Sequence, residues 1–132
     1  MQNFEEVYKE LGKLFIEKLP TYIEKINEKK NDGLIIQPFN NTSLEENCIK
    51  HPCFKLTFTG GEYSEKDRII ENEVYTVSLE IFLKTQIENI IIAYSRYVEA
   101  LQIMLNEEES SFQYKITKIE GMKVFINIIS TI

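Results

Sequence analysis

The segment Glu73–Leu83 reads EVYTVSLEIFL. From Tyr75 onward its odd-numbered positions are all apolar, whereas its even-numbered positions include Thr76, Ser78 and Glu80. Alternation with a period of two residues is typical of a half-buried strand, because successive side chains point to opposite faces of a sheet. The pattern therefore predicts a long strand whose odd-numbered residues face the core.

The apolar period changes after this strand. Apolar residues then recur at steps of three and four, at Ile87, Ile90, Ile91, Tyr94, Val98, Leu101 and Leu105. This spacing is the stripe of an amphipathic helix. We therefore expect a strand that runs directly into a helix as the central unit of the domain.

The N-terminal segment also has helical spacing. Its apolar stripe comprises Phe4, Tyr8, Leu11, Phe15, Leu19, Tyr22 and Ile26. Pro20 interrupts the pattern, and proline lacks a backbone donor and disfavours helix at the preceding residue. The sequence thus predicts a kink or break near Leu19, then a second helical piece that ends at Asn31-Asp32-Gly33.

Two segments before the central strand have strand character. Residues 34–36 are apolar and Pro38 follows them, which predicts a short strand at a sheet edge. Residues 53–59 alternate, and Gly60-Gly61 should end or bulge that strand. Because this strand precedes the central one directly, we expect a long antiparallel hairpin. Its connection, residues 60–72, is charged and should project as a mobile loop.

A second hairpin closes the chain. It joins residues 112–119 to residues 122–129 through a tight turn at Glu120-Gly121. The last strand is apolar on both faces because of Phe125 and Ile129. We expect that this strand lies inside the sheet or that a partner covers its outer face.

Runs of strands separated by one helix predict an α+β fold. The expected architecture is one mostly antiparallel sheet of about four to five strands with an N-terminal helix and a central helix packed on it. A chain of 132 residues is one domain by size, so residues 1–132 are expected to form it alone.

Composition excludes several functional classes. The net charge is -6, and the one basic run, Lys29-Lys30, lies among acidic residues, so we expect no sequence-specific nucleic-acid binding. No window approaches the roughly 18 consecutive apolar residues of a membrane span. The first residues lack the basic and apolar regions of a secretory signal, which favours the cytoplasm of the producing cell.

Cys48, His51 and Cys53 are the residues nearest to a reactive or metal-binding set. A structural metal site needs four ligands, and the spacing of these three is unusual. A disulfide would close a very small loop, and cytosolic cysteines stay reduced. We therefore expect a buried strand cysteine at Cys53, an ordinary loop thiol at Cys48, and no catalytic residue, metal or cofactor.

The combined pattern resembles a family of phage tail terminator, or tail completion, proteins. Similar small proteins belong to contractile-tailed phages, defective prophages and phage-tail-like bacteriocins of Gram-positive bacteria. The resemblance depends on the N-terminal helix, the segment His51-Pro52-Cys53-Phe54-Lys55-Leu56, the strand Tyr75–Phe82, the helix with Tyr97-Val98-Glu99-Ala100-Leu101 and the closing hairpin Phe112–Ile128.

The resemblance implies a structural subunit and no enzyme. Such a protein forms a hexameric ring on the end of the tail tube, ends tube and sheath polymerisation, and connects to the neck or collar. Its implied partners are further copies of itself, the tail tube protein, the sheath, and neck or collar proteins. It would start in the cytoplasm of the producing bacterium and end in the phage or phage-tail-like particle.

We expect the contacts with neighbouring subunits or the tube to involve the charged connection and the last strand. The candidate interface residues are Glu62, Tyr63, Glu65, Lys66, Asp67, Arg68, Phe125 and Ile129. Tyr63 would be the aromatic anchor, and the charges would set the register. The alternatives are a stand-alone small α+β binding or immunity protein and a small enzyme, which the absence of a convincing nucleophile, base or metal set disfavours.

Overall fold

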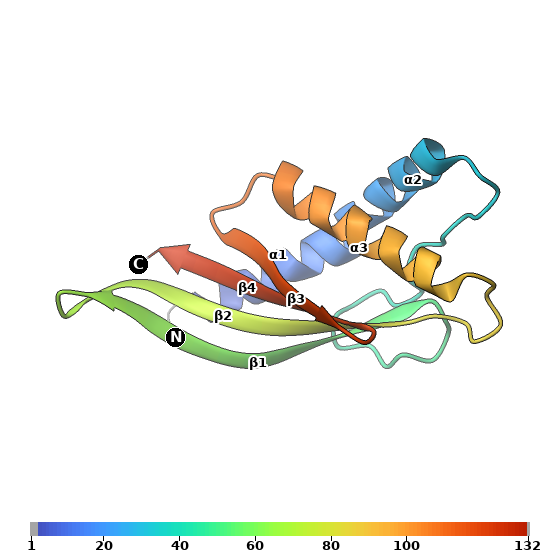
Figure 1. The fold of residues 1–132 in the computed structure, drawn as a ribbon. Helices are drawn as coiled ribbons and strands as arrows, with labels where there is room; N and C mark the ends of the chain where they lie inside the picture. The colour runs from blue at the N-terminus through green and yellow to red at the C-terminus, as the bar shows by residue number, and fades with distance from the viewer. Residues whose placement is uncertain (1–2, 132) are drawn as a thin grey trace.

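The computed structural model describes residues 3–131 and has one sheet with helices on one side (Figure 1). The helical elements are α1 (Phe4–Gly12), the π-helical segment η1 (Lys13–Lys18), α2 (Leu19–Lys30) and α3 (Ile90–Glu107). The strands are β1 (Cys53–Lys66), β2 (Ile69–Phe82), β3 (Gln113–Glu120) and β4 (Lys123–Thr131).

The four strands form an antiparallel sheet in the order β1-β2-β4-β3. Both hairpins and the α+β class predicted from the sequence are confirmed. The last strand, β4, lies between β2 and β3 and is therefore interior to the sheet. Irregular pairing between Phe58 and Gly60 confirms the predicted bulge before Gly61.

The predicted inward face of the central strand is correct. Tyr75, Val77, Leu79, Ile81 and Leu83 are all buried. The alternate residues of β4 join them in the core, at Val124, Ile126 and Ile128. One face of the sheet thus supplies the apolar surface on which the helices pack.

The helix after the central strand begins at Ile90, beyond a short connection, and its stripe is rotated from the predicted one. Tyr94, Leu101 and Leu105 are buried as predicted, but Ile91 is 70% exposed. Tyr97 and Met104 occupy the core instead. Three consecutive isoleucines, Ile90–Ile92, start this helix, and they cannot all lie on the one face that packs on the sheet. Spacing alone therefore could not show that Ile91 faces away from the core.

We predicted a kink or a break near Leu19, and the break does not occur. Helical residues run without interruption from Phe4 to Lys30, and the six-residue π segment precedes the proline. In that segment the Leu19 amide donates to the Leu14 carbonyl, one residue further back than in an α-helix. This local change of pairing accommodates Pro20 inside a continuous helix. The helix ends as predicted, with Asn31 in a left-handed conformation.

The predicted edge strand at residues 34–36 is also wrong, because this segment forms no strand. Its backbone bonds to side chains instead. The Ile36 amide donates to Asn27 Oδ1 at 3.0 Å, and Asn27 Nδ2 donates to the Ile36 carbonyl at 2.9 Å. Ile36 is buried in the core. The short apolar run is therefore part of a connecting segment that packs into the core, and it does not pair with a strand.

Candidate functional site

One face of the sheet is left open by the helices, which lie together on the other side (Figure 1). It is built by the outward residues of the two interior strands, and we call these residues the open face. They are Val74, Thr76 and Glu80 of β2, and Phe125, Asn127 and Ile129 of β4, whereas Ser78 on the same side is buried. Strand alternation places them there, because their sequence neighbours fill the core.

The open face combines apolar and polar side chains. Val74 pairs directly with Ile129 across the strands, and both are partly exposed. Thr76 donates a hydrogen bond to Asn127 Oδ1 at 3.2 Å, and Lys118 lies over the Phe125 ring, 4.7 Å from its centroid. The polar Thr76–Asn127 pair thus lies between the apolar Val74–Ile129 pair and Phe125, and such a mixture of apolar and polar surface occurs in protein interfaces.

The predicted loop at residues 60–72 is in fact a long two-stranded hairpin, which corrects the sequence-based expectation. β1 and β2 stay paired up to Lys66 and Ile69, and the turn is Asp67-Arg68 alone. Both turn residues have positive φ, 53° and 66°. A two-residue type I′ turn, whose twist matches that of the paired strands, requires positive φ at both positions. Backbone pairing thus extends through a charged sequence that has no core to face.

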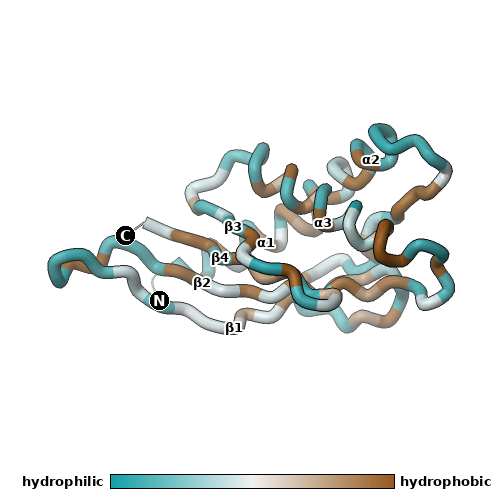
Figure 2. The backbone as a smooth tube through the Cα atoms, in the orientation of Figure 1, coloured by the Kyte–Doolittle hydropathy of each residue, from teal (hydrophilic) through white to brown (hydrophobic). Residues whose placement is uncertain are grey.

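The end of this hairpin projects beyond the rest of the sheet (Figure 1). The last pair between β2 and β4 is Asn72 with Thr131, so within the described residues no third strand pairs with Glu65–Glu71, which we call the ribbon. Every residue of the ribbon is exposed, and its tip is hydrophilic (Figure 2). Ile69 and Ile70 are apolar exceptions, 67% and 41% exposed.

The structure sorts the predicted interface residues into two neighbouring groups. Glu65, Lys66, Asp67 and Arg68 lie in the ribbon, and Phe125 and Ile129 lie on the open face. Glu62 lies between them, since Glu62, Val74 and Ile129 form one row across three strands. Tyr63 pairs with the buried Glu73, so its half-exposed side chain is on the opposite, helical side of the sheet. The sequence analysis missed Ile69 and Ile70, although two isoleucines directly after a charged run were a visible signal.

A buried carboxylate holds the base of the hairpin against the N-terminal helix. Glu73 is fully buried, accepts a hydrogen bond from the Tyr75 hydroxyl, and accepts another from the Asn3 amide at 3.0 Å. Burial and this carboxylate raise the pKa of the Tyr75 phenol, so Tyr75 stays a donor. Asn3 Nδ2 also donates to Ser130 Oγ at 2.7 Å. The chain start, β2 and β4 are thereby joined behind the open face.

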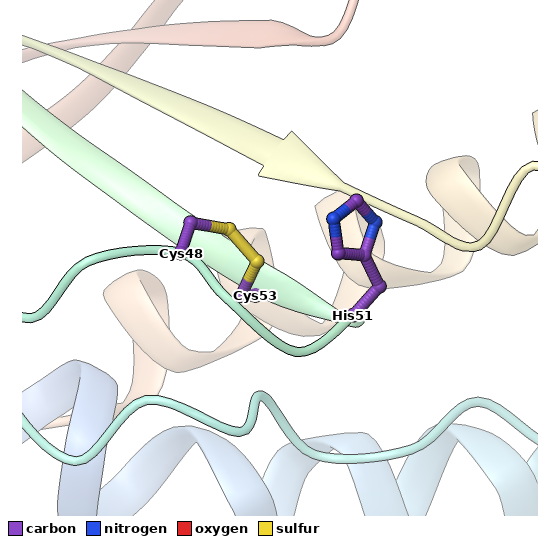
Figure 3. A group of neighbouring side chains, drawn as sticks. All are labelled: Cys48, His51 and Cys53. Atoms are coloured by element: carbon purple, nitrogen blue, oxygen red, sulfur yellow. A yellow bond between two sulfur atoms is a disulfide. The ribbon is translucent and has the colours of Figure 1, made fainter.

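A second group of chemically competent side chains lies at the start of β1. Cys48 and Cys53 form a disulfide with their Cα atoms 5.6 Å apart, which corrects the expectation of two separate thiols (Figure 3). The turn between them brings the cysteines within the range that a disulfide spans. Small loop size was therefore a poor guide to their pairing.

His51 completes this group. One ligand atom each from Cys48, His51 and Cys53 lie within 4.8 Å of one another, so the three side chains converge on one point. His51 Nδ1 lies 3.1 Å from the Leu83 carbonyl oxygen, at the end of the central strand. With Cys48, the ring lines a surface cavity of about 690 Å³ that also contacts Glu45, Glu46 and Lys55.

Comparison with known proteins does not decide between these two sites. The chain matches no family model and no curated protein. Within residues 3–131, no helix combines the length and the apolarity that crossing a membrane requires. A functional assignment must therefore be argued from the open face, the ribbon and the cysteine-histidine group themselves.

Proposed function

We propose that this protein is a tail-terminator subunit that forms a homohexameric ring on the end of a phage-type tail tube. In this role the ring ends tube and sheath growth and connects to the neck or collar. The resemblance described above suggested the role, and the open face is the observation that carries it. The protein would act by assembly, in the cytoplasm of the producing bacterium and then in the particle.

The open face supports a permanent contact. Val74, Phe125 and Ile129 expose apolar surface on strands whose alternate residues fill the core. Interior strands cannot extend the sheet, so this surface is useful for face-to-face burial against another chain. A head-to-tail contact between identical subunits generates a closed ring when its rotation closes.

The ribbon supports a second contact. It projects from the same end of the sheet as Ile129 and carries charges of both signs beside Ile69 and Ile70. Charge pairs at an interface rim fix register, and a central apolar anchor supplies affinity. In the proposed ring the ribbon reaches the neighbouring subunit or the tube ring below. The net charge of -6 suits a lumen through which DNA passes without sticking.

A pair of matched substitutions tests the proposal. Ile129→Glu adds a charge to the open face, whereas Ile91→Glu adds the same charge to an exposed isoleucine on the helical side. We expect both proteins to stay folded, because neither side chain is buried. Tails from cells that carry Ile129→Glu should lack the subunit and be overlong in electron micrographs, and tails with Ile91→Glu should be of normal length.

Two results would contradict the proposal. Normal, capped tails with Ile129→Glu would exclude the open face as the ring contact. A single copy bound per tail, or a stable complex with one unrelated protein and no tail association, would favour the binding or immunity role instead. Circular dichroism of both variants, compared with the wild type, separates loss of assembly from loss of folding.

A further inference from the structure

The cysteine-histidine group has the donor set of a soft-metal site. Two thiolates and an imidazole are the ligands that select zinc over magnesium or calcium. In a tetrahedral site with bonds of about 2.0 to 2.3 Å, neighbouring ligand atoms lie about 3.5 to 3.8 Å apart. The three ligand atoms here already lie within 4.8 Å of one another. The two bonded sulfur atoms would have to separate by about 1.5 to 2 Å to reach this spacing, and side-chain rotation within the short turn can supply that.

His51 is already oriented for coordination. Its Nδ1 hydrogen bond to the Leu83 carbonyl makes Nδ1 the protonated nitrogen, because a carbonyl oxygen can only accept. The lone pair of the neutral ring then belongs to Nε2. Figure 3 shows the ring edge that bears one nitrogen turned toward the two sulfur atoms. A hydrogen bond from the opposite nitrogen to a carbonyl is the usual support of a histidine that binds a metal.

The surroundings leave one coordination position to solvent. Glu45, Glu46 and Lys55 line the same cavity as Cys48 and His51. The Glu46 carboxylate is bound to the Thr42 amide and hydroxyl, the latter at 2.8 Å, and these bonds hold it in its own turn. A water molecule from the cavity can thus fill the fourth position of a tetrahedral ion.

The disulfide prevents metal binding while it persists. Reduction by a dithiol transfers two electrons and two protons, breaks the S–S bond, and yields two cysteine thiols and the cyclic disulfide of the reductant. A zinc ion that then binds displaces both thiol protons to solvent and leaves two thiolate ligands. No other co-reactant is required.

We propose that reduction of the Cys48–Cys53 disulfide opens a zinc site formed by Cys48, Cys53 and His51, with water as the fourth ligand. The site ties the turn before β1 to the end of β2 through the Leu83 carbonyl. In a reducing cytoplasm the zinc-bound form would prevail, and in an oxidising medium the disulfide would replace it. This inference is independent of the proposed role in tail assembly.

The test uses the purified full-length chain under anaerobic conditions. One sample is reduced and the other keeps its disulfide, so both have the same sequence. Each is incubated with zinc, separated from free ion, and analysed by mass spectrometry of the metal. We expect about one zinc ion per reduced chain and none per oxidised chain. Cobalt in place of zinc should give a thiolate-to-metal charge-transfer band with the reduced chain alone.

Substitutions then identify the ligands. His51→Ala and Cys48→Ser should each weaken zinc binding by at least about tenfold, the effect that even outer-shell changes reach. Asn47→Ala is the matched control, because Asn47 lines the same cavity without a soft donor. Cys53 is left unchanged since it is buried and its replacement risks the fold. A reduced chain without zinc, equal binding by the oxidised chain, or unchanged affinity in His51→Ala would each overturn the proposal.

Discussion

Two tyrosines on α3 form a natural comparison at the scale of single residues. Tyr97 is buried and its hydroxyl donates to the Gln37 carbonyl at 2.5 Å. Tyr94 is buried to a similar degree, yet its hydroxyl has no hydrogen-bond partner among residues 3–131. A buried polar group without a partner loses its hydration and gains nothing in return.

We predict opposite effects of removing these two hydroxyl groups. Tyr97→Phe should lower the free energy of unfolding by about 0.5–1.5 kcal/mol, because it deletes a hydrogen bond. Tyr94→Phe should leave it unchanged or raise it, because it deletes an unpaired hydroxyl. Urea denaturation of the two variants, each the control for the other, measures the difference. A larger loss in Tyr94→Phe would show that this hydroxyl has a partner after all.

Side-chain partners are also where sequence-based prediction failed most clearly. The apolar stripes located core tyrosines such as Tyr75 and Tyr94, because burial follows periodicity. Periodicity contains no information on the contact between Asn27 and Ile36 or on the Cys48–Cys53 bond. Those depend on how a connection without regular structure turns in space, which the packed helices and strands determine.

At the scale of elements, α2 and α3 are joined by charged contacts. Arg96 of α3 is buried and donates to Asp32 through both Nη1, at 3.0 Å, and Nη2. Its Nη1 also donates to the Leu34 carbonyl at 2.8 Å. Lys29 and Lys30 at the end of α2 pair with Glu99 at 3.0 and 3.2 Å. The turn after α2 is thereby held against α3.

The Asp32–Arg96 contact predicts a specific acid dependence. Hydrogen bonds from Arg96 and the Leu34 amide lower the pKa of Asp32 from 3.8 to about 2. A carboxyl group whose pKa is lower in the folded state stabilises the fold above its unfolded pKa and loses this effect as the pH falls. The contribution of Asp32 should therefore be complete above pH 4 and disappear between about pH 4 and pH 2.

Melting temperatures measured across this range test the prediction. Asp32→Asn should reduce the melting temperature at neutral pH and flatten its decline between about pH 4 and pH 2. Glu28→Gln, which changes an exposed carboxylate of α2 just before this turn, is the control and should keep the wild-type decline. If Asp32→Asn declines as steeply as the wild type, other carboxylates dominate acid unfolding.

The elements themselves were largely predictable, and their ends were not. Alternation located the inward face of β2. Pro20 marked the region where the helical hydrogen bonding changes, because the π segment ends at Lys18 and α2 begins at Leu19. The presence of proline could not show that a π-helical segment would keep the helix continuous, because that depends on tertiary packing. Likewise, the charged ribbon lacks alternation, so its strand pairing follows from backbone hydrogen bonds and the Asp67-Arg68 turn.

At the scale of the whole molecule, the helices bury one sheet face and leave two features free, the open face and the ribbon (Figures 1 and 2). The sequence predicted part of each, since Phe125 and Ile129 break the alternation and the charges gather before Ile69. It did not predict their shape. A mobile loop would have to lose conformational entropy on docking, whereas a paired ribbon is already ordered.

The ribbon contributes no residue to the core, so its removal should leave the rest of the fold intact. Ser64 pairs with Asn72, and Glu65–Glu71 between them are all exposed. Replacing these seven residues by Asn-Gly closes the same strands with a two-residue turn of the same class. We expect the shortened monomer to keep its circular dichroism spectrum and to melt near the wild-type temperature, because no core residue is lost.

The shortened protein should nevertheless fail to assemble. If the ribbon makes the contact with the neighbouring subunit or the tube, tails from cells with this variant should lack the terminal ring and vary in length. A variant with Asp67-Arg68 replaced by Asn-Gly keeps the ribbon paired and removes two of its proposed register-setting charges, so it should cap tails less uniformly than the wild type but better than the shortened protein. Capped tails of normal length with the shortened protein would leave the open face as the sole candidate contact, because Ile129 and Phe125 remain in place.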